Sequence, residues 1–264
     1  WPFIQSFIMT FQNTNLHNSV FVGLDNYIKI FSDRRFIKSI FVTSKFVFIS
    51  VPLKLVFALF IAMLLKNQFK GVGAFRSLLY MPSLIGGSVA IAAMWMQLFG
   101  VNGLINNALG IFGIQGRAWV SNPHTALYVL IILTIWQFGS SMVIFLSGLK
   151  NIPQSLYEAA EVDGATKIQS FFRITLPMLS PIILFNMILQ TINSFQVFTQ
   201  AFIITGGGPM NETLFTVLHI YRKAFSNMEM GYASAMSWVL LLLIGIATGI
   251  IFLTSKYWVY YESK

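Results

Sequence analysis

Five apolar segments, each long enough to cross a lipid bilayer, constrain the fold of this chain more than any other feature. A spanning helix needs about 20 apolar residues, and every one of these segments reaches that length. They lack the strict alternation of a membrane β-barrel, and only 9% of the residues are charged, against about 25% in a soluble domain. The chain is therefore predicted to be an all-α membrane protein. The segments are residues 40–65, 78–99, 126–149, 179–205 and 233–257.

Residues 1–11 are also apolar, but they are too short to span a bilayer. No small-residue cleavage site follows them, as it would after a signal peptide. We therefore expect them to belong to a truncated first helix, which brings the total to about six spanning helices. Because the connections are short, residues 1–264 are predicted to form a single transmembrane domain.

Composition excludes several function classes. The net charge is +9, but the basic residues are scattered between apolar runs, which argues against nucleic acid and suggests contact with anionic lipid. The chain has no Cys. No histidine pair has metal-ligand spacing, and no Ser/His/Asp or paired-carboxylate site lies within the membrane. We expect neither catalysis nor a bound metal or cofactor in this chain.

The loop 151–177 lies between two apolar segments and is rich in acidic residues. Ser155 with Glu158, and Thr166 with Gln169, have capping-box spacing, and Gly164 between them permits a turn that other residues resist. A helix-turn-helix that projects from the bilayer is predicted. An amphipathic loop on the membrane surface is the alternative, but anionic lipid would repel its acidic tip, which favours a protein partner. The tip carries Glu158, Glu161 and Asp163.

A family resemblance rests on this loop. The pattern Glu-Ala-Ala, three residues, Gly, nine residues, Ile, one residue, Leu-Pro is matched in full. It resembles the EAA loop of permease subunits in binding-protein-dependent ABC importers. Residues 22–27, 205–213 and 231–235 are similar to the carbohydrate branch, the maltose and glycerol-phosphate type permeases. The matching loop residues, with Asp163 beside them, are Glu158, Ala159, Ala160, Asp163, Gly164, Ile174, Leu176 and Pro177.

The resemblance implies the type I ABC importer permease fold and a set of partners. Loop 151–177 would be cytoplasmic and would couple the permease to an ABC ATPase dimer, which binds ATP and Mg. A second homologous permease would complete the translocation path, and an extracytoplasmic solute-binding protein would deliver a sugar or oligosaccharide. The implied location is a bacterial-type plasma membrane, crossed several times.

The segment Gly206, Gly207, Gly208, Pro209 is glycine-rich, but it lacks the Lys-Ser/Thr that follows a phosphate-binding loop. A turn is predicted. By resemblance it would be an external loop that faces the solute-binding protein.

Polar residues interrupt the segment 179–205 at spacings of 4, 3 and 7 residues, which place them on one helical stripe. Buried amides are costly against lipid, so the stripe faces protein or water. It predicts either interhelical hydrogen bonds or a path for sugar hydroxyls. The stripe is Asn186, Gln190, Asn193 and Gln200, with Trp136 and Gln137 as weaker candidates on the preceding segment.

Lys54 lies inside the segment 40–65. A charge at that depth is costly and indicates a function, although its side chain could also extend to the headgroups. If Lys54 reaches the substrate path, a carboxylated or a phosphorylated sugar is favoured. An ion-coupled secondary carrier is the main alternative function, but it predicts inverted repeats and buried carboxylates, and the apolar segments contain no Asp or Glu.

Overall fold

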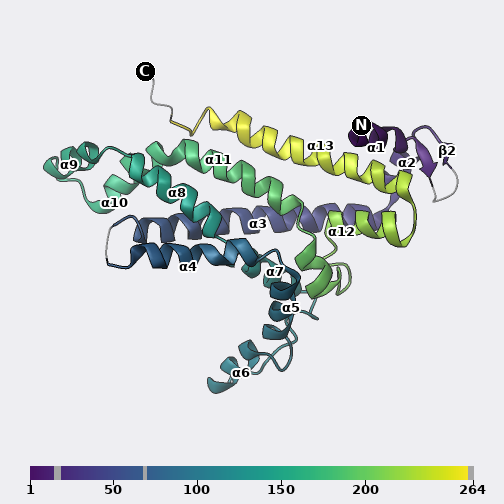
Figure 1. Cartoon of the computed structure of the whole chain (residues 1–264), viewed down its shortest axis with the longest axis horizontal. Helices are drawn as coiled ribbons and strands as arrows, with labels where there is room; N and C mark the ends of the chain where they lie inside the picture. The colour runs from purple at the N-terminus through teal and green to yellow at the C-terminus, as the bar shows by residue number, and fades with distance from the viewer. Residues whose placement is uncertain (15–18, 68–69, 261–264) are drawn as a thin grey trace. The chain divides into compact units, whose positions relative to one another are not determined.

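The computed structural model describes residues 1–14, 19–67 and 70–260. They are mostly helical (Figure 1) and fall into two compact units. Unit 1 comprises Trp1–Phe48, Gly87–Ile132 and Asn193–Ile246, and unit 2 comprises Ile49–Gly86, Leu133–Ile192 and Ala247–Lys264.

Four long helices contribute residues to both units: α3 (Arg34–Leu64), α7 (Ala126–Trp136), α11 (Leu176–Phe195) and α13 (Met230–Ser255). Unit 1 further contains α1 (Pro2–Met9), strands β1 (Gln12–Thr14) and β2 (Ser19–Phe21), α2 (Asp25–Ser32), α5 (Val89–Leu98), α6 (Leu104–Ile111), the π-helical turn η2 (Ala201–Thr205), α12 (Thr216–Tyr221) and the π-helical turn η3 (Arg222–Ser226). Unit 2 further contains α4 (Val72–Ile85), α8 (Gly139–Asn151), α9 (Gln154–Val162), α10 (Lys167–Ser170) and the π-helical turn η1 (Phe171–Thr175).

In unit 1, the core joins the start of α3 to α2 and α13. Ile30, Phe36 and Met236 are buried together there. β1 and β2 pair in antiparallel orientation, and the buried Asn26 donates hydrogen bonds to the carbonyls of Thr10 and Gln12, at 2.8 and 3.0 Å. These two bonds attach the hairpin and α1 to α2.

In unit 2, close helix packing depends on two glycines of α8. A Cβ on Gly139 would lie 2.7 Å from the backbone of α4 at Leu79 and Tyr80, and a Cβ on Gly148 would overlap side chains of α11. Small residues let apolar helices approach each other in this way. In Figure 1, α9 and α10 lie beyond the ends of α8 and α11.

Three continuous helical segments within the described residues are long and apolar enough to cross a membrane: Arg34–Leu64, Lys167–Phe195 and Met230–Ser255. The number rises to five if each of two broken pairs, α4 with α5 and α7 with α8, counts as one span. These five correspond to the five predicted apolar segments. Many large apolar side chains on them are exposed, as expected for helices that contact lipid.

The expectation of a continuous helix over 78–99 is wrong. α4 ends at Ile85, Gly86 and Gly87 follow, and Ser88 begins α5 by accepting a hydrogen bond from the amide of Ile91. Two glycines followed by an N-cap residue end one helix and start another. The segment 126–149 is likewise interrupted, between Trp136 and Gly139.

Candidate docking loop and transport path

α9 follows α8 after a short bend at Ile152 and Pro153. Pro153 is the N-cap of α9, and no side chain caps the helix there. Ser155 therefore lies inside the first turn, and the predicted capping box between Ser155 and Glu158 is not formed. The physical reason is the fixed φ of proline, which prepares the chain for the helix one residue before Ser155.

The turn after α9 and the start of α10 agree with the sequence prediction. Gly164 has φ +75°, a left-handed conformation that favours glycine. Thr166 and Gln169 form the capping box in full: the Thr166 hydroxyl accepts from the Gln169 amide at 3.3 Å, and the Thr166 amide donates to the Gln169 side chain at 2.7 Å. The helix-turn-helix is therefore confirmed.

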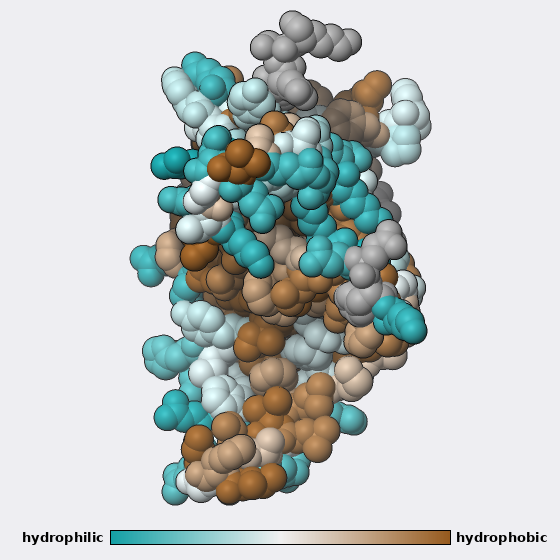
Figure 2. Space-filling view, turned by 90° about the vertical axis from the view of Figure 1, so that its left-hand side faces the viewer, coloured by the Kyte–Doolittle hydropathy of each residue, from teal (hydrophilic) through white to brown (hydrophobic). Residues whose placement is uncertain are grey.

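The surface of this loop is hydrophilic with exposed apolar positions. Figure 2 looks onto the end of unit 2 that carries α9 and α10, where hydrophilic side chains gather with a few hydrophobic ones among them. Glu158, Glu161 and Asp163 are exposed. Val162 is 88% exposed and Ile168 72% exposed. The loop therefore combines exposed carboxylates with single exposed apolar side chains on one folded projection.

Several residues of the EAA pattern meet at one cavity of about 360 Å³ between α9 and the α10–η1 segment. The fixed spacings of the motif thus place residues from both sides of the turn around the same cavity. The motif residues in the lining are Ala160, Gly164 and Ile174, and Asp163 beside the motif also lines it.

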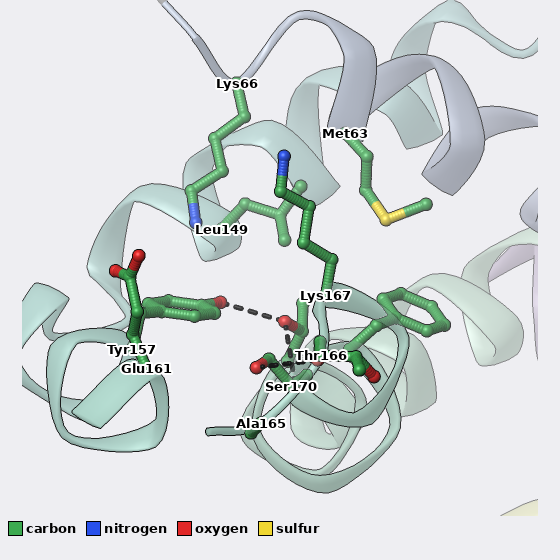
Figure 3. A pocket seen from close by; sticks show the side chains of 11 residues that line it. Met63, Lys66, Leu149, Tyr157, Glu161, Ala165, Thr166, Lys167 and Ser170 are labelled. Atoms are coloured by element: carbon green, nitrogen blue, oxygen red, sulfur yellow. Dashed lines mark hydrogen bonds between the residues drawn. The ribbon is translucent and has the colours of Figure 1, made fainter. Parts of the chain in front are cut away.

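A larger cavity of about 620 Å³ lies on another side of α9, between α9, α10 and the ends of α3 and α8 (Figure 3). The Lys66 ammonium lies 4.2 Å from the centre of the Tyr157 ring, a cation–π contact. The Tyr157 hydroxyl is hydrogen-bonded to that of Thr175 at 2.9 Å. Tyr157 thus connects α9 to the residues that follow α3 and to η1, which leads into α11.

The glycine-rich segment forms a turn, as predicted. Gly206 and Gly207 have φ +55° and +79°. The Gly206 carbonyl accepts a hydrogen bond from the Arg222 guanidinium, and the Gly208 carbonyl accepts one from the Thr213 hydroxyl. Met210 at the tip is 81% exposed. The backbone carbonyls of this segment are therefore used to fix the turn.

The predicted polar stripe is only partly present. Asn186 and Gln190 are buried one helical turn apart on α11. Asn193 is exposed, and α11 ends at Phe195, so Gln200 does not belong to the same helix. The prediction of one continuous stripe is therefore wrong at Gln200, because the helix stops before it.

The buried amides have polar neighbours within unit 2. Gln190 accepts a hydrogen bond from the Lys54 ammonium at 2.8 Å, and Asn186 donates to the carbonyl of Ser141 on α8 at 3.4 Å. Gln137, between α7 and α8, donates to the carbonyl of Gly86 at 3.0 Å, so its amide fixes the end of α4. Trp136 is the last residue of α7 and is partly buried.

Unit 1 also contains a polar cluster that was not predicted from the sequence. Asp33 accepts hydrogen bonds from the Tyr232 hydroxyl at 2.9 Å and from the amides of Arg35 and Phe36. Its Oδ2 lies 3.7 Å from Nε2 of the buried His219, too far for a hydrogen bond. Asp33 and His219 are 186 positions apart in the sequence (219 − 33). The only local signal in the sequence was Asp33 itself, which lies one residue before α3 and could be recognised as an N-cap.

Burial shifts the titration of this cluster. Burial lowers the pKa of His219, and the nearby Asp33 carboxylate opposes that effect only in part. For Asp33, burial acts to raise the pKa, but the hydrogen bonds from Tyr232, Phe36 and Arg35 bring it below 3.8. The arrangement therefore favours a neutral histidine beside a charged carboxylate.

Comparison with known proteins assigns the family. Residues 21–259 match the family described as "Binding-protein-dependent transport system inner membrane component". The chain is 50% identical over its full length to the "Probable ABC transporter permease protein YesP" of Bacillus subtilis (strain 168), of which it covers 87%. It is 36% identical, over 82% of its length and 74% of the relative's, to the permease MalF of the trehalose/maltose transport system of Thermococcus litoralis.

A solved structure shares the fold. The chain superposes with a TM-score of 0.82 on a bacterial ABC transporter "involved in the import of the acidic polysaccharide alginate". The match covers 97% of this chain and 88% of the other, at 23% identity, so it establishes the fold alone.

The chain belongs to the family of inner membrane components of binding-protein-dependent transport systems. It is a multi-pass permease subunit of an ABC importer with the fold that the resemblance implied. The comparisons give no support to the ion-coupled secondary carrier.

Proposed function

We propose that this permease imports a sugar or oligosaccharide, and that the α9–α10 loop couples it to a cytoplasmic ABC ATPase dimer that binds ATP and Mg. The observation that carries this proposal is the loop itself. It is a folded helix-turn-helix with three exposed carboxylates and exposed apolar side chains. The coupling residues would be Glu158, Ala159, Ala160, Asp163, Gly164, Ile174, Leu176 and Pro177.

The sugar substrate is inferred from relatives and from chemistry. A relative with 36% identity is named for trehalose and maltose transport. Amide side chains pair well with sugar hydroxyls because each amide both donates and accepts. The path would include Asn186, Gln190 and Asn193 of α11, together with Lys54. It would be completed by a second, homologous permease in a bacterial plasma membrane.

The turn Gly206–Pro209 would face the solute-binding protein. Met210 beside it is strongly exposed, and bonds from Arg222 and Thr213 fix the turn. The Lys38 ammonium also pairs with Glu212 at 2.6 Å. A fixed, projecting turn loses little conformational entropy when a partner binds it.

Purification of the tagged chain from its own membranes, with every co-purifying polypeptide identified by mass spectrometry, tests the proposal. Wild-type protein should bring a second permease and an ABC ATPase. Glu158→Lys should lose the ATPase and sugar uptake but keep the second permease and normal membrane insertion. Glu158→Lys reverses the charge at the docking surface. The new ammonium would repel a positively charged group of the ATPase that the Glu158 carboxylate would attract.

Asp25→Lys is the matched control, because Asp25 is also an exposed acidic residue in a helix but lies outside the loop. It should retain the ATPase. If Glu158→Lys keeps both the ATPase and full uptake, the docking role of Glu158 is wrong. An active chain that purifies alone would contradict the whole assembly.

A further inference from the structure

Among the residues that the structure describes, no carboxylate pairs with the ammonium of Lys54. The residue is 7% exposed, and its ammonium donates one hydrogen bond, to Oε1 of Gln190 at 2.8 Å. An ammonium has three N–H donors, and the described part of the chain supplies no acidic partner and no second acceptor for Lys54. A buried charge is stable only when it is paired.

The sequence excludes a carboxylate from any of the spanning helices. All eight acidic residues lie outside α3, α4, α5, α7, α8, α11 and α13. No carboxylate on these helices can pair with Lys54, so a negatively charged group of another molecule would stabilise its ammonium there. The acidic residues are Asp25, Asp33, Glu158, Glu161, Asp163, Glu212, Glu229 and Glu262.

Further polar groups near Lys54 in unit 2 also have unused capacity. Oδ1 of Asn186 and the hydroxyls of Ser141 and Ser50 are buried and have no hydrogen-bond partner among the described residues. Ser50 is one helical turn from Lys54 on α3, and Asn186 contacts the Ser141 backbone at 3.4 Å. Buried polar atoms without partners are rare in proteins, so these atoms keep hydrogen-bonding capacity for a polar ligand in a conformation of the transporter that exposes them.

The spacing of these groups fits a sugar ring. Asn186 and Gln190 are four residues apart on α11, which corresponds to about 6 Å along a helix and is comparable to the width of a pyranose. A single ammonium beside an amide matches the one negative charge and two oxygens of a carboxylate. A phosphate carries more charge and is more often bound by several cationic groups.

We propose that Lys54 and Gln190 bind the carboxylate of an acidic sugar, a uronate residue, during its passage, while Asn186 and Ser141 bind hydroxyls of the same ring. This inference rests on the proposed function, because it names the class of sugar that the permease accepts. The carboxylate would accept hydrogen bonds from the unused N–H groups of Lys54 and from the amide nitrogen of Gln190.

Uptake by the complete importer in proteoliposomes tests this inference. The probes are oligosaccharides of galacturonate, mannuronate and glucuronate, each paired with the same oligosaccharide after reduction of its carboxyl groups to alcohols. The wild type should take up at least one acidic probe in preference to its neutral counterpart. Lys54→Gln should lower that uptake about 10- to 100-fold, as expected for loss of a charged hydrogen bond, and should reduce neutral uptake far less.

Two further variants separate specificity from structure. Lys54→Arg retains the charge and should recover part of the acidic uptake. Lys45→Gln removes a charge from an exposed position of the same helix and should leave both kinds of uptake unchanged. Basal ATPase activity and pairing with the second permease, measured on each variant, show whether the complex is intact.

The outcomes are distinct. Preference of the wild type for neutral probes overturns the inference, and so does equal loss of acidic and neutral uptake in Lys54→Gln. Loss of the second permease in Lys54→Gln would show that Lys54 pairs with a partner carboxylate instead, which also overturns it. If an intact complex transports no saccharide from either set, the proposed sugar function itself is wrong.

Discussion

The Tyr157 hydroxyl lies 2.9 Å from the Thr175 hydroxyl, which joins the loop helix α9 to the last residue of η1. Thr175 is buried, and the next residue begins α11. Because α9 is attached at this point as well as through the chain, a force applied to α9 reaches α11 directly. If the loop docks an ATPase, as we propose, this hydrogen bond would transmit its movement to α11 in addition to the chain itself.

Tyr157→Phe should weaken coupling without loss of docking. The ring remains, so the cation–π contact with Lys66 is retained, and only the bond to Thr175 is removed. The free energy that links α9 to α11 should fall by about 1 kcal/mol, the typical net contribution of one hydrogen bond. We expect this to appear as a roughly fivefold lower uptake per ATP hydrolysed. The control is Tyr128→Phe, which removes the hydroxyl of an exposed tyrosine on α7. Unchanged uptake per ATP in Tyr157→Phe would contradict this link.

Gly164→Ala should destabilise the loop through backbone strain alone. Gly164 has φ +75°, and no atom lies within 4 Å of an added Cβ, so crowding does not contribute. An L-residue in that conformation costs about 1–2 kcal/mol. Two measurements check this. Less ATPase should co-purify with the variant, and the loop should be cleaved more rapidly by protease.

Gly73→Ala is the matched control, because Gly73 lies in helix α4 and an added Cβ also meets nothing within 4 Å. Alanine in a helix is favoured over glycine by about 1 kcal/mol, so this variant should be neutral or slightly stabilising. Equal behaviour of the two variants would show that the turn at Gly164 is not strained by a side chain.

Acidification should destabilise unit 1 through His219. Its pKa lies below 6.5 in the folded protein, so the unfolded chain binds more protons as the pH falls through 6.5. Unfolding is then favoured at low pH, by up to about 1.4 kcal/mol for each unit of the pKa difference. The thermal unfolding midpoint in nanodiscs should therefore be lower at pH 5.5 than at pH 7.5. Asp33 contributes only at lower pH, since its pKa is below 3.8.

His219→Gln should remove most of this dependence between pH 7.5 and 5.5. His124→Gln, which replaces an exposed histidine, should keep it. A midpoint in wild-type protein that does not change with pH would show that His219 is as readily protonated in the folded as in the unfolded chain.

Features set by neighbouring residues were predictable from the sequence. The turn at Gly164 and the capping box of Thr166 with Gln169 depend on local backbone chemistry, and both are present. The existence of five apolar segments was also predicted correctly, because hydropathy reports which residues avoid water, whereas the breaks within two of them and the end of α11 were not. The roles of the EAA residues in coupling remain a prediction.

Features that depend on helix continuity or on distant contacts were not predictable. α11 ends at Phe195, although no Gly or Pro occurs between Asn193 and Thr205 to mark an end. The spacing of Ser155 and Glu158 predicted a capping box that is not formed, because Pro153 is the N-cap of α9 and Ser155 lies inside its first turn. The pairing of Lys54 with Gln190 joins positions 136 residues apart, which no local pattern reveals.

The number of residues in the π-helical turn η1 determines how α9 is rotated relative to α11. Each residue of an α-helix turns the chain by about 100°, and a π-helical turn accommodates an additional residue without lengthening the helix by a full turn. Deleting one residue from Phe171–Thr175 would barely shorten the segment, yet it would rotate α9 and its carboxylates about the axis of α11. The nine residues between Gly164 and Ile174 therefore fix the direction in which α9 and Glu158 point around the axis of α11.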